Sequence, residues 1–168
     1  MVTLFKLKDG SPARDFKSVE EMDEIMINRW NEVVRAEDHV WHLGDVSFIR
    51  PRMDSIFPRL MGHKRLILGN HDKFQPSAYS KWFQKIRGSQ VHDGLLMTHI
   101  PVAPWSFGRF KANVHWHVHS THPLVYKYKY KDKDGEEINK VYVNVSVEAI
   151  DYRPISLEEV QKIVRKEL

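Results

Sequence analysis

Four short blocks of the sequence carry the side chains that could do chemistry. In chain order they read WHLGD at 41–45, LILGNHD at 66–72, LLMTHIP at 95–101 and VHWHVH at 114–119. In each block, carboxylate, amide or imidazole side chains follow an apolar stretch that is typical of a buried strand. These groups are ligands for divalent metal ions. The blocks therefore predict a metal site assembled from the ends of several strands.

The first two blocks supply oxygen ligands and a candidate acid. Asp45 follows a glycine at a strand end, where a carboxylate can bridge two cations, although an Asx turn is the alternative for this pair. Asn70 offers a neutral oxygen to a hard cation. His71 could protonate a leaving oxygen, and Asp72 beside it could orient the imidazole and raise its basicity.

The last two blocks supply imidazoles. His99 ends an apolar run, and His117 and His119 flank Val118. We expect an extended segment here, because alternate residues of a strand point to one face and both imidazoles would then reach the same metal. His115 shares this parity and is expected to support the site or to pack in the core.

The composition favours a single folded domain. The chain has 168 residues, 42% of them hydrophobic, and a length of this order supports one compact core. It has no cysteine, so a metal must be held by histidine, asparagine and carboxylates. The net charge of +4 mildly favours an anionic substrate. No apolar run approaches ~20 residues and no signal peptide is recognised, so we expect a cytoplasmic protein without a membrane partner.

The apolar pattern predicts helices alternating with short strands, followed by a hairpin. Helices are expected over 18–34, 53–60 and 79–86, the last closed by Gly88, with a final helix capped by Ser156. Buried strands are expected over 40–43, 65–68, 95–97 and 112–114. A long hairpin is expected over 123–150, turning at Asp134 and Gly135. This order indicates an α/β protein whose ligands gather at the carboxyl ends of strands.

Taken together, the four blocks resemble the calcineurin-like metallophosphoesterase superfamily, from about Phe16 to the end of the chain. The resemblance implies one domain over 1–168 with a two-sheet β-sandwich flanked by helices, a four-layer αββα arrangement. It implies hydrolysis of phosphomonoesters or phosphodiesters by metal-activated water. His71 would be the catalytic histidine that contacts phosphate, supported by Asp72. One metal site would be complete, and its ligands would be Asp45, Asn70, His99 and His117.

The chain departs from the family pattern in two places. The second metal site should combine Asp45 and His119 with an opening D-x-H motif, and no D-x-H occurs in the sequence. Trp116 stands where the family's G-H-x-H motif has glycine. Three explanations stay open: an amino-terminal truncation, a natural enzyme with one firm site, or a degenerate relative that binds without turnover. Residues 2–7 are a weak candidate for a remnant of the first strand.

The cofactors and partners follow from the ligand types. Manganese is the first expectation for the divalent ions, with iron, zinc, cobalt and nickel as alternatives. The expected partner is a small phosphate ester or a nucleotide, and a nuclease of the same fold is a weaker alternative. Tyrosines and lysines alternate over 126–131, which is typical of a solvent-facing hairpin, with nucleic-acid binding as the other interpretation. Residues 105–109, between two ligand blocks, are interpreted as a loop on the substrate side.

Overall fold

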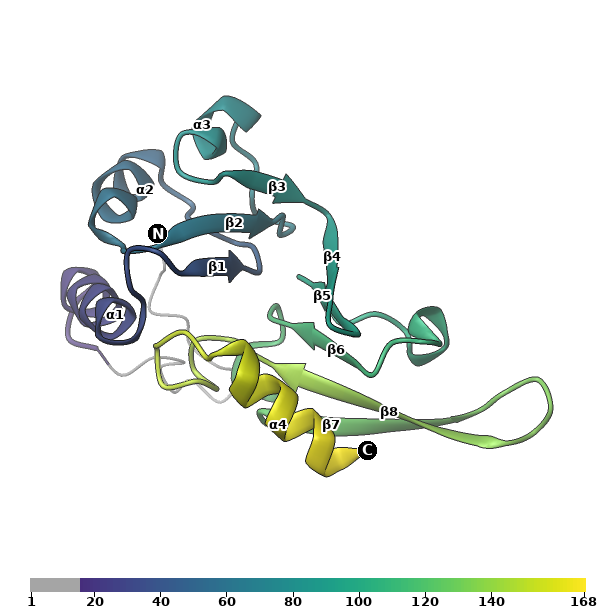
Figure 1. Cartoon of the computed structure of the whole chain (residues 1–168). Coiled ribbons are helices and arrows are strands. Elements are labelled where there is room, and N and C mark those ends of the chain that lie inside the picture. The colour runs from purple at the N-terminus through teal and green to yellow at the C-terminus, as the bar shows by residue number, and fades with distance from the viewer. Residues whose placement is uncertain (1–15) are drawn as a thin grey trace.

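Two β-sheets flanked by helices make up the computed structural model, which describes residues 16–168 (Figure 1). The elements, in chain order, are α1 (Val19–Val33), β1 (His39–His42), α2 (Arg50–Ile56), η1 (Phe57–Arg59), β2 (His63–Ile67), α3 (Pro76–Ser80), β3 (Lys85–Arg87), β4 (Ser89–His92), β5 (Leu95–Thr98), η2 (Pro104–Phe107), β6 (Ala112–His115), η3 (His119–Thr121), β7 (Val125–Lys131), β8 (Glu137–Asn144) and α4 (Leu157–Glu167). The expected α/β class and the arrangement of two sheets with flanking helices are confirmed.

The two sheets differ in their strand directions. The first sheet has the order β1-β2-β3 and is parallel throughout. The second has the order β4-β5-β6-β8-β7, in which β5, β6 and β8 are parallel and the two edge strands are antiparallel to their neighbours. Parallel strands end at a common edge of their sheet, so the loops after β1 and β2, and those after β5 and β6, emerge together.

The main core lies between the sheets. It is formed by buried residues that follow β1, belong to β2, or lie on one face of β5, β6, β8 and α4, namely Leu43, Ile67, Leu95, Met97, Ala112, Val114, Val141, Val143, Val160 and Val164. A second cluster packs α2 and α3 on the other face of the first sheet through Met53, Phe57, Leu66 and Tyr79. Leu66 and Ile67 thus point to opposite faces, as the alternation of a strand requires.

The outer face of the second sheet carries no α-helix in the part of the chain that the structure describes. The helix α4 packs on the inner face of this sheet, since Val160 and Val164 belong to the core between the sheets. The outer face is covered in part by η2, whose Phe107 is buried against Tyr142. The expected fourth layer is therefore missing from residues 16–168, and aromatic side chains occupy that face instead.

The helix ends follow their local sequence. Ser18 caps α1 by accepting a hydrogen bond from the Glu21 amide, and Ser156 with Glu159 forms a complete capping box at α4. The helix expected over 18–34 matches α1 within a residue at each end, and the final helix begins directly after Ser156, as expected. No helix in residues 16–168 is long and apolar enough to cross a membrane.

The expected helix over 79–86 is wrong. The helix α3 ends at Ser80, and residues 85–87 form the strand β3, in which Ile86 pairs with Leu66 of β2. Tyr79 and Phe83 belong to one buried cluster, and Ile86 packs against it. These residues are apolar because they share this cluster, although they do not lie on one continuous helix. The strands β3 and β4 are short and mostly exposed, which leaves little apolar signal in the sequence.

Candidate metal centre

Three of the predicted ligands converge on a ring nitrogen of a fourth, His99. The Nε2 atom of His99 lies 2.9 Å from Asn70 Oδ1, 3.1 Å from His117 Nδ1 and 3.3 Å from Asp45 Oδ2. Ligand atoms of Asp45, His99 and His117 all lie within 4.8 Å of one another. The carboxylate and the amide follow β1 and β2 of the first sheet, and the two imidazoles follow β5 and β6 of the second. The cluster therefore lies where the two sheets meet.

The spacing of these atoms fits a divalent cation. Metal–ligand distances near 2.1 Å place neighbouring donor atoms about 3.0–3.4 Å apart in octahedral or tetrahedral coordination. The three separations from His99 Nε2 fall close to this range. Two imidazoles, one carboxylate and one amide oxygen suit manganese, iron, zinc, cobalt or nickel, and they do not select among these ions.

Two glycines allow the loops after β1 and β2 to touch. A Cβ atom on Gly69 would lie 2.3 Å from Asp45 Oδ1 and 2.5 Å from the Asp45 amide nitrogen. A Cβ atom on Gly44 would lie 2.5 Å from the Gly69 nitrogen and 2.7 Å from His99 Nδ1. Asp45 itself has a left-handed backbone with φ of 52°. These close approaches place the Asp45 carboxylate against His99.

The orientation of His99 leaves one nitrogen for a metal. Its Nδ1 lies 2.6 Å from the carbonyl oxygen of Leu43, to which it can donate, so that the Nε2 lone pair faces the cluster. Burial alone would lower the pKa of His99, but hydrogen bonds to Asp45 and to the Leu43 carbonyl outweigh it and raise this pKa. Burial alone would raise the pKa of Asp45, but hydrogen bonds from His99 and from the His71 amide lower it.

The segment that carries His117 is a tight turn, so the expected extended segment is wrong. His117 and His119 have positive φ angles of 26° and 49°, and the amide of Val118 donates to the carbonyl of Trp116. The left-handed residues are the two histidines and not Trp116, so the tryptophan fits where the family motif has glycine. The Trp116 ring packs between those of His99 and His119, at 5.6 and 5.1 Å.

His117 reaches the cluster from this turn, and its imidazole is partly buried. Burial lowers the pKa of His117, and the neighbouring His99 adds to the shift. A lowered pKa favours the neutral imidazole, which is the form that binds a metal. The turn therefore presents an imidazole whose pKa is shifted in the direction that favours metal binding.

Asp72 holds the loops together, which differs from the expected role beside His71. Its carboxylate accepts hydrogen bonds of 2.8 Å from the backbone amides of Asp45, Val46 and Gly69. Both oxygens are thus occupied by the loops after β1 and β2, and within residues 16–168 neither accepts a hydrogen bond from the His71 ring. Asp72 fixes the positions of the first two metal-ligand loops.

His71 lies at the exposed rim of the cluster. Its backbone amide donates to Asp45 Oδ1 over 2.9 Å, and its ring lies 5.0 Å from that of Phe48. The imidazole is therefore placed beside the cluster without being one of the converging ligands. This position suits a group that meets a bound substrate.

His119 lies outside the converging set. Its Nδ1 is 3.3 Å from Oε1 of Glu148, and the side chain of Glu148 is only 7% exposed. A carboxylate on one imidazole nitrogen orients the ring and raises its basicity toward a metal at the other nitrogen. The expected role of His119 in a second site stays a prediction, and Glu148 is its structural support.

Sequence reasoning missed two partners of the site. The carbonyl of Leu43 leaves no signal in the sequence, because every residue has one. Glu148 follows the end of β8 as the ligand blocks follow their strands, but it stands in a segment without histidine or glycine. Its position after a buried strand was the available signal.

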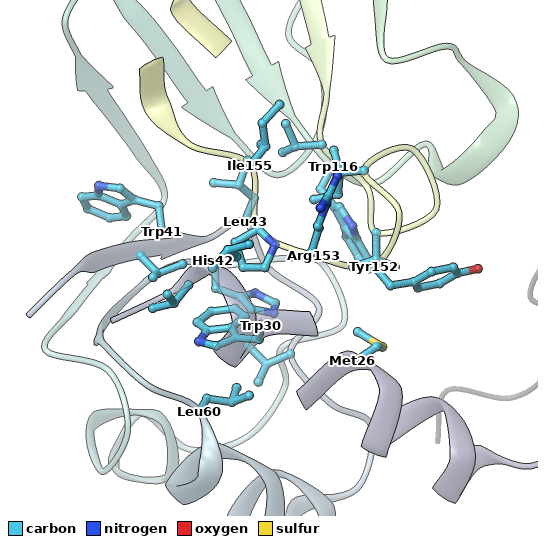
Figure 2. Close-up of a pocket in the computed structure, with 18 of the residues that line it drawn as sticks. Met26, Trp30, Trp41, His42, Leu43, Leu60, Trp116, Tyr152, Arg153 and Ile155 are labelled. Carbon is cyan, nitrogen blue, oxygen red and sulfur yellow. The ribbon is translucent and has the colours of Figure 1, made fainter. Parts of the chain in front are cut away.

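An apolar cavity of about 620 Å³ adjoins the cluster (Figure 2). One wall is the run of consecutive residues 38–47, which includes all of β1 and the metal-ligand candidate Asp45. The helix α1 and the loop before α4 form other walls through Trp30 and Tyr152, and Trp116 lies beside the metal cluster. Because β1 pairs only with β2 among the described strands, its second edge faces this cavity.

Comparisons with known proteins identify relatives in an archaeon and in mycobacteriophages, and one solved structure of similar fold. No protein-family model matches the sequence. The chain is 49% identical over 51 residues to the Gene 66 protein of Mycobacterium phage D29, a stretch that covers 28% of this chain and 26% of the phage protein. The solved structure of the protein of unknown function AQ665 from Aquifex aeolicus has a similar fold, with a TM-score of 0.60 and 23% identity over 88% of this chain and 86% of that one.

A further relative matches nearly the whole chain. The uncharacterized protein MJ1445 of Methanocaldococcus jannaschii is 30% identical over 157 residues, which cover 91% of this chain and 81% of that protein. Because the match covers 91% of this chain, it includes all four ligand blocks. The chain belongs to the same family as MJ1445.

Proposed function

We propose that the protein is a metal-dependent phosphoesterase of the calcineurin-like group. The observation that carries the proposal is the convergence of Asp45, Asn70 and His117 on the Nε2 atom of His99. This mixture of one carboxylate, one amide and two imidazoles is the set that the superfamily resemblance implies for its complete metal site. The substrates would be phosphomonoesters or phosphodiesters, and the cytoplasmic location belongs to the same proposal.

The chain's own residues can be given roles in this chemistry. When bound, a divalent ion supplies Lewis acidity and makes water nucleophilic near neutral pH. Asp45 would offset the positive charge, and the Leu43 carbonyl would hold His99 with its free nitrogen toward the ion. His71, exposed at the rim, would protonate the leaving oxygen as the ester bond breaks.

A second ion requires more ligands than the described residues bring together. Asp45 and His119 are candidates, and the family pattern adds an aspartate and a histidine from a D-x-H strand. Among the described strands, β1 has a neighbour on one edge only, and Asp45 follows its end by three residues, so a parallel strand on the other edge would bring its last residues toward the cluster. This geometry supports the explanation that a further strand belongs beside β1. Residues 2–7, interpreted as a remnant of that strand, lie outside the described residues.

The deciding experiment measures manganese binding and hydrolysis separately. Metal content after dialysis and hydrolysis of bis-p-nitrophenyl phosphate would be compared for the unmodified chain, Asp45→Asn, and Asp134→Asn as a control at the exposed hairpin tip. We expect Asp45→Asn to lose both properties and Asp134→Asn to keep both. A folded chain that binds no manganese would overturn the metal site. A chain that binds manganese without hydrolysing phosphate esters would overturn the catalytic assignment in favour of a binding role.

His71 gives an independent test of the mechanism. His71→Ala should retain manganese because its imidazole is not among the converging ligands, but it should lower kcat about a hundredfold, as expected for loss of a general acid. The defect should be smaller for a substrate whose leaving group needs no proton. Equal turnover by the variant and the parent would remove His71 from the mechanism.

A further inference from the structure

Aromatic side chains dominate the outer face of the second sheet. The strand register places on this face Ser89, Val91, Leu96, Thr98, Asn113, His115, Tyr126, Tyr128, Tyr130, Ile138, Lys140, Tyr142 and Asn144. None of these residues is acidic, and Lys140 is the one ordinary cation among them. The face therefore offers ring surfaces without a carboxylate that would repel an anion.

Several rings on this face are open to solvent. Trp105 is 69% exposed and Tyr128 is 49% exposed, although large aromatic side chains are usually covered in a folded domain. Trp105 lies 6.3 Å from Tyr130, and Tyr128 lies 5.9 Å from Tyr126, measured between ring centroids. We call Trp105, Tyr126, Tyr128 and Tyr130 the aromatic track; Trp105 belongs to η2, and the three tyrosines belong to β7, which with β8 forms the projecting hairpin in Figure 1.

The aromatic track rests on a fixed base. Tyr142 is buried beneath it, stacks on Tyr126 at 5.1 Å, and donates its hydroxyl to the carbonyl of Val102. The ammonium of Lys140 donates to the carbonyl of Gly108 over 2.6 Å. These two hydrogen bonds hold both ends of the segment that carries Trp105. A ligand that binds the Trp105 ring would therefore lose little free energy in ordering this segment.

The aromatic track begins at the edge of the second sheet where β6 leads into the turn of His117, since Val125 of β7 and His115 of β6 both pair with the end of β8. The turn that carries His117 ends at His122, whose ring lies 4.8 Å from that of Tyr126. Asn144 holds this turn by donating to the carbonyls of His119 and His122. An extended ligand on the rings would therefore have one end beside the cluster.

The lysines of β7 lie on the face of the sheet opposite to the aromatic track. Lys127 and Lys129 point to the opposite face, where they pair with Glu167 and Glu137 at 3.1 and 2.9 Å. Lys140 is buried beneath the rings and bound to the Gly108 carbonyl, so the exposed cation next to this segment is Arg109. The alternating pattern thus separates lysines that pair with glutamates from the tyrosines on the other face.

We propose that the aromatic track binds single-stranded nucleic acid and leads one end of it to the metal cluster, which deepens and rests on the proposed phosphoesterase function. Bases stack on exposed rings whatever their sequence, and the exposed guanidinium of Arg109 would meet a phosphate of the same strand. A duplex hides its base faces and is excluded. The substrate class is then an oligonucleotide end or an internal phosphodiester of a single strand.

The test measures binding without catalysis. Fluorescence anisotropy would follow a labelled oligothymidylate of about ten nucleotides with the full chain in EDTA at low salt. We expect Trp105→Ala and Tyr128→Ala each to weaken binding about tenfold, the order expected for losing one stacked base. Tyr128→Phe keeps the ring and Lys131→Ala lies on the other face, so both should bind like the parent. Thermal unfolding would verify that each variant is folded.

The outcomes separate this proposal from the phosphoesterase assignment. Three results would each overturn the proposal for the aromatic track. In the first, the parent fails to bind the oligonucleotide; in the second, both alanine variants bind it as tightly as the parent does; in the third, the parent binds a duplex as tightly as the single strand. Concentration-dependent dimerisation that the alanine variants abolish, without oligonucleotide binding, would assign the rings to a second copy of the chain and also overturn it. Because the binding assay contains no metal, its failure leaves the hydrolysis of bis-p-nitrophenyl phosphate as a separate result.

Discussion

At the scale of single residues, the carboxylate of Asp72 does more for the site than its place beside His71 indicated. It ties together the amides of Asp45, Val46 and Gly69, which belong to two loops that are remote in the sequence. The sequence showed that a polar residue follows Asn70 and His71, but the direction of its side chain depends on the turn of the backbone. Residue types in the four blocks predicted the ligands, and only the folded loops reveal which side chains support them.

Replacement of Asp72 should therefore weaken the fold as well as the site. We expect Asp72→Ala to lower the free energy of unfolding by about 2–4 kcal/mol, because three amides lose a charged acceptor. Urea unfolding would measure the change, with Asp134→Ala at the exposed hairpin tip as the control. Equal midpoints for the two variants would show that water replaces the carboxylate without cost.

A buried phenol should make stability sensitive to alkaline pH. Burial raises the pKa of Tyr142 to about 12, above its ordinary value near 10. A raised acid pKa means that the unfolded chain loses this proton first, so the stabilising contribution is complete below pH 10 and is lost as the pH rises from 10 to about 12. Unfolding midpoints measured across this window should fall. Tyr142→Phe should flatten the dependence, and an unchanged slope would contradict the assignment.

At the scale of elements, the loops after β1 and β2 approach each other closely because glycines, Gly44 and Gly69, stand where they touch. Gly69→Ala would drive a Cβ atom into Asp45, whereas Gly88→Ala meets nothing within 4 Å. We expect the first substitution to lower manganese affinity about tenfold or more, in line with other changes that displace a ligand. Gly88→Ala is the matched control and should bind manganese like the parent. Isothermal titration would compare them, and equal affinities would mean that the loops separate without disturbing Asp45.

The elements themselves were predictable where packing and local sequence agree. The capped helices α1 and α4 and the hairpin of β7 and β8 carry their own signals, a serine before each helix and Asp134 with Gly135 at the turn. The strand β3 was not predictable, since its single half-buried residue, Ile86, continued the spacing of the preceding helix. The turn at His117 was also missed, because histidines at alternating positions are typical of a strand and the turn depends on tertiary packing.

At the scale of the whole molecule, the cluster joins two sheets. Asp45 and Asn70 come from the loops of the first sheet, and His99 and His117 come from the second. A bound ion would thus connect layers that otherwise meet through apolar packing. The order of strands and blocks in the sequence predicted that the ligands would gather, but not that they would divide equally between the sheets.

Metal should therefore raise the stability of the entire fold. Manganese at ~100 times its dissociation constant should add about 2.7 kcal/mol, because it binds the folded chain and not the unfolded one. The thermal midpoint would be measured with and without manganese for the parent and for His117→Ala. We expect a rise in the parent alone. An equal rise in His117→Ala would mean that the ion binds elsewhere.

Among residues 16–168, β1 has a neighbouring strand on one edge only, and this bears on how the purified chain behaves at high concentration. A strand whose second edge lacks a neighbour presents backbone donors and acceptors that another polypeptide can pair with. Here that edge opens into an apolar cavity, so an incoming strand would gain both a hydrogen-bonded ladder and burial of its side chains. Edge-to-edge association and strand exchange between copies would begin at β1, and a short peptide that fills the cavity would act as a solubilising additive.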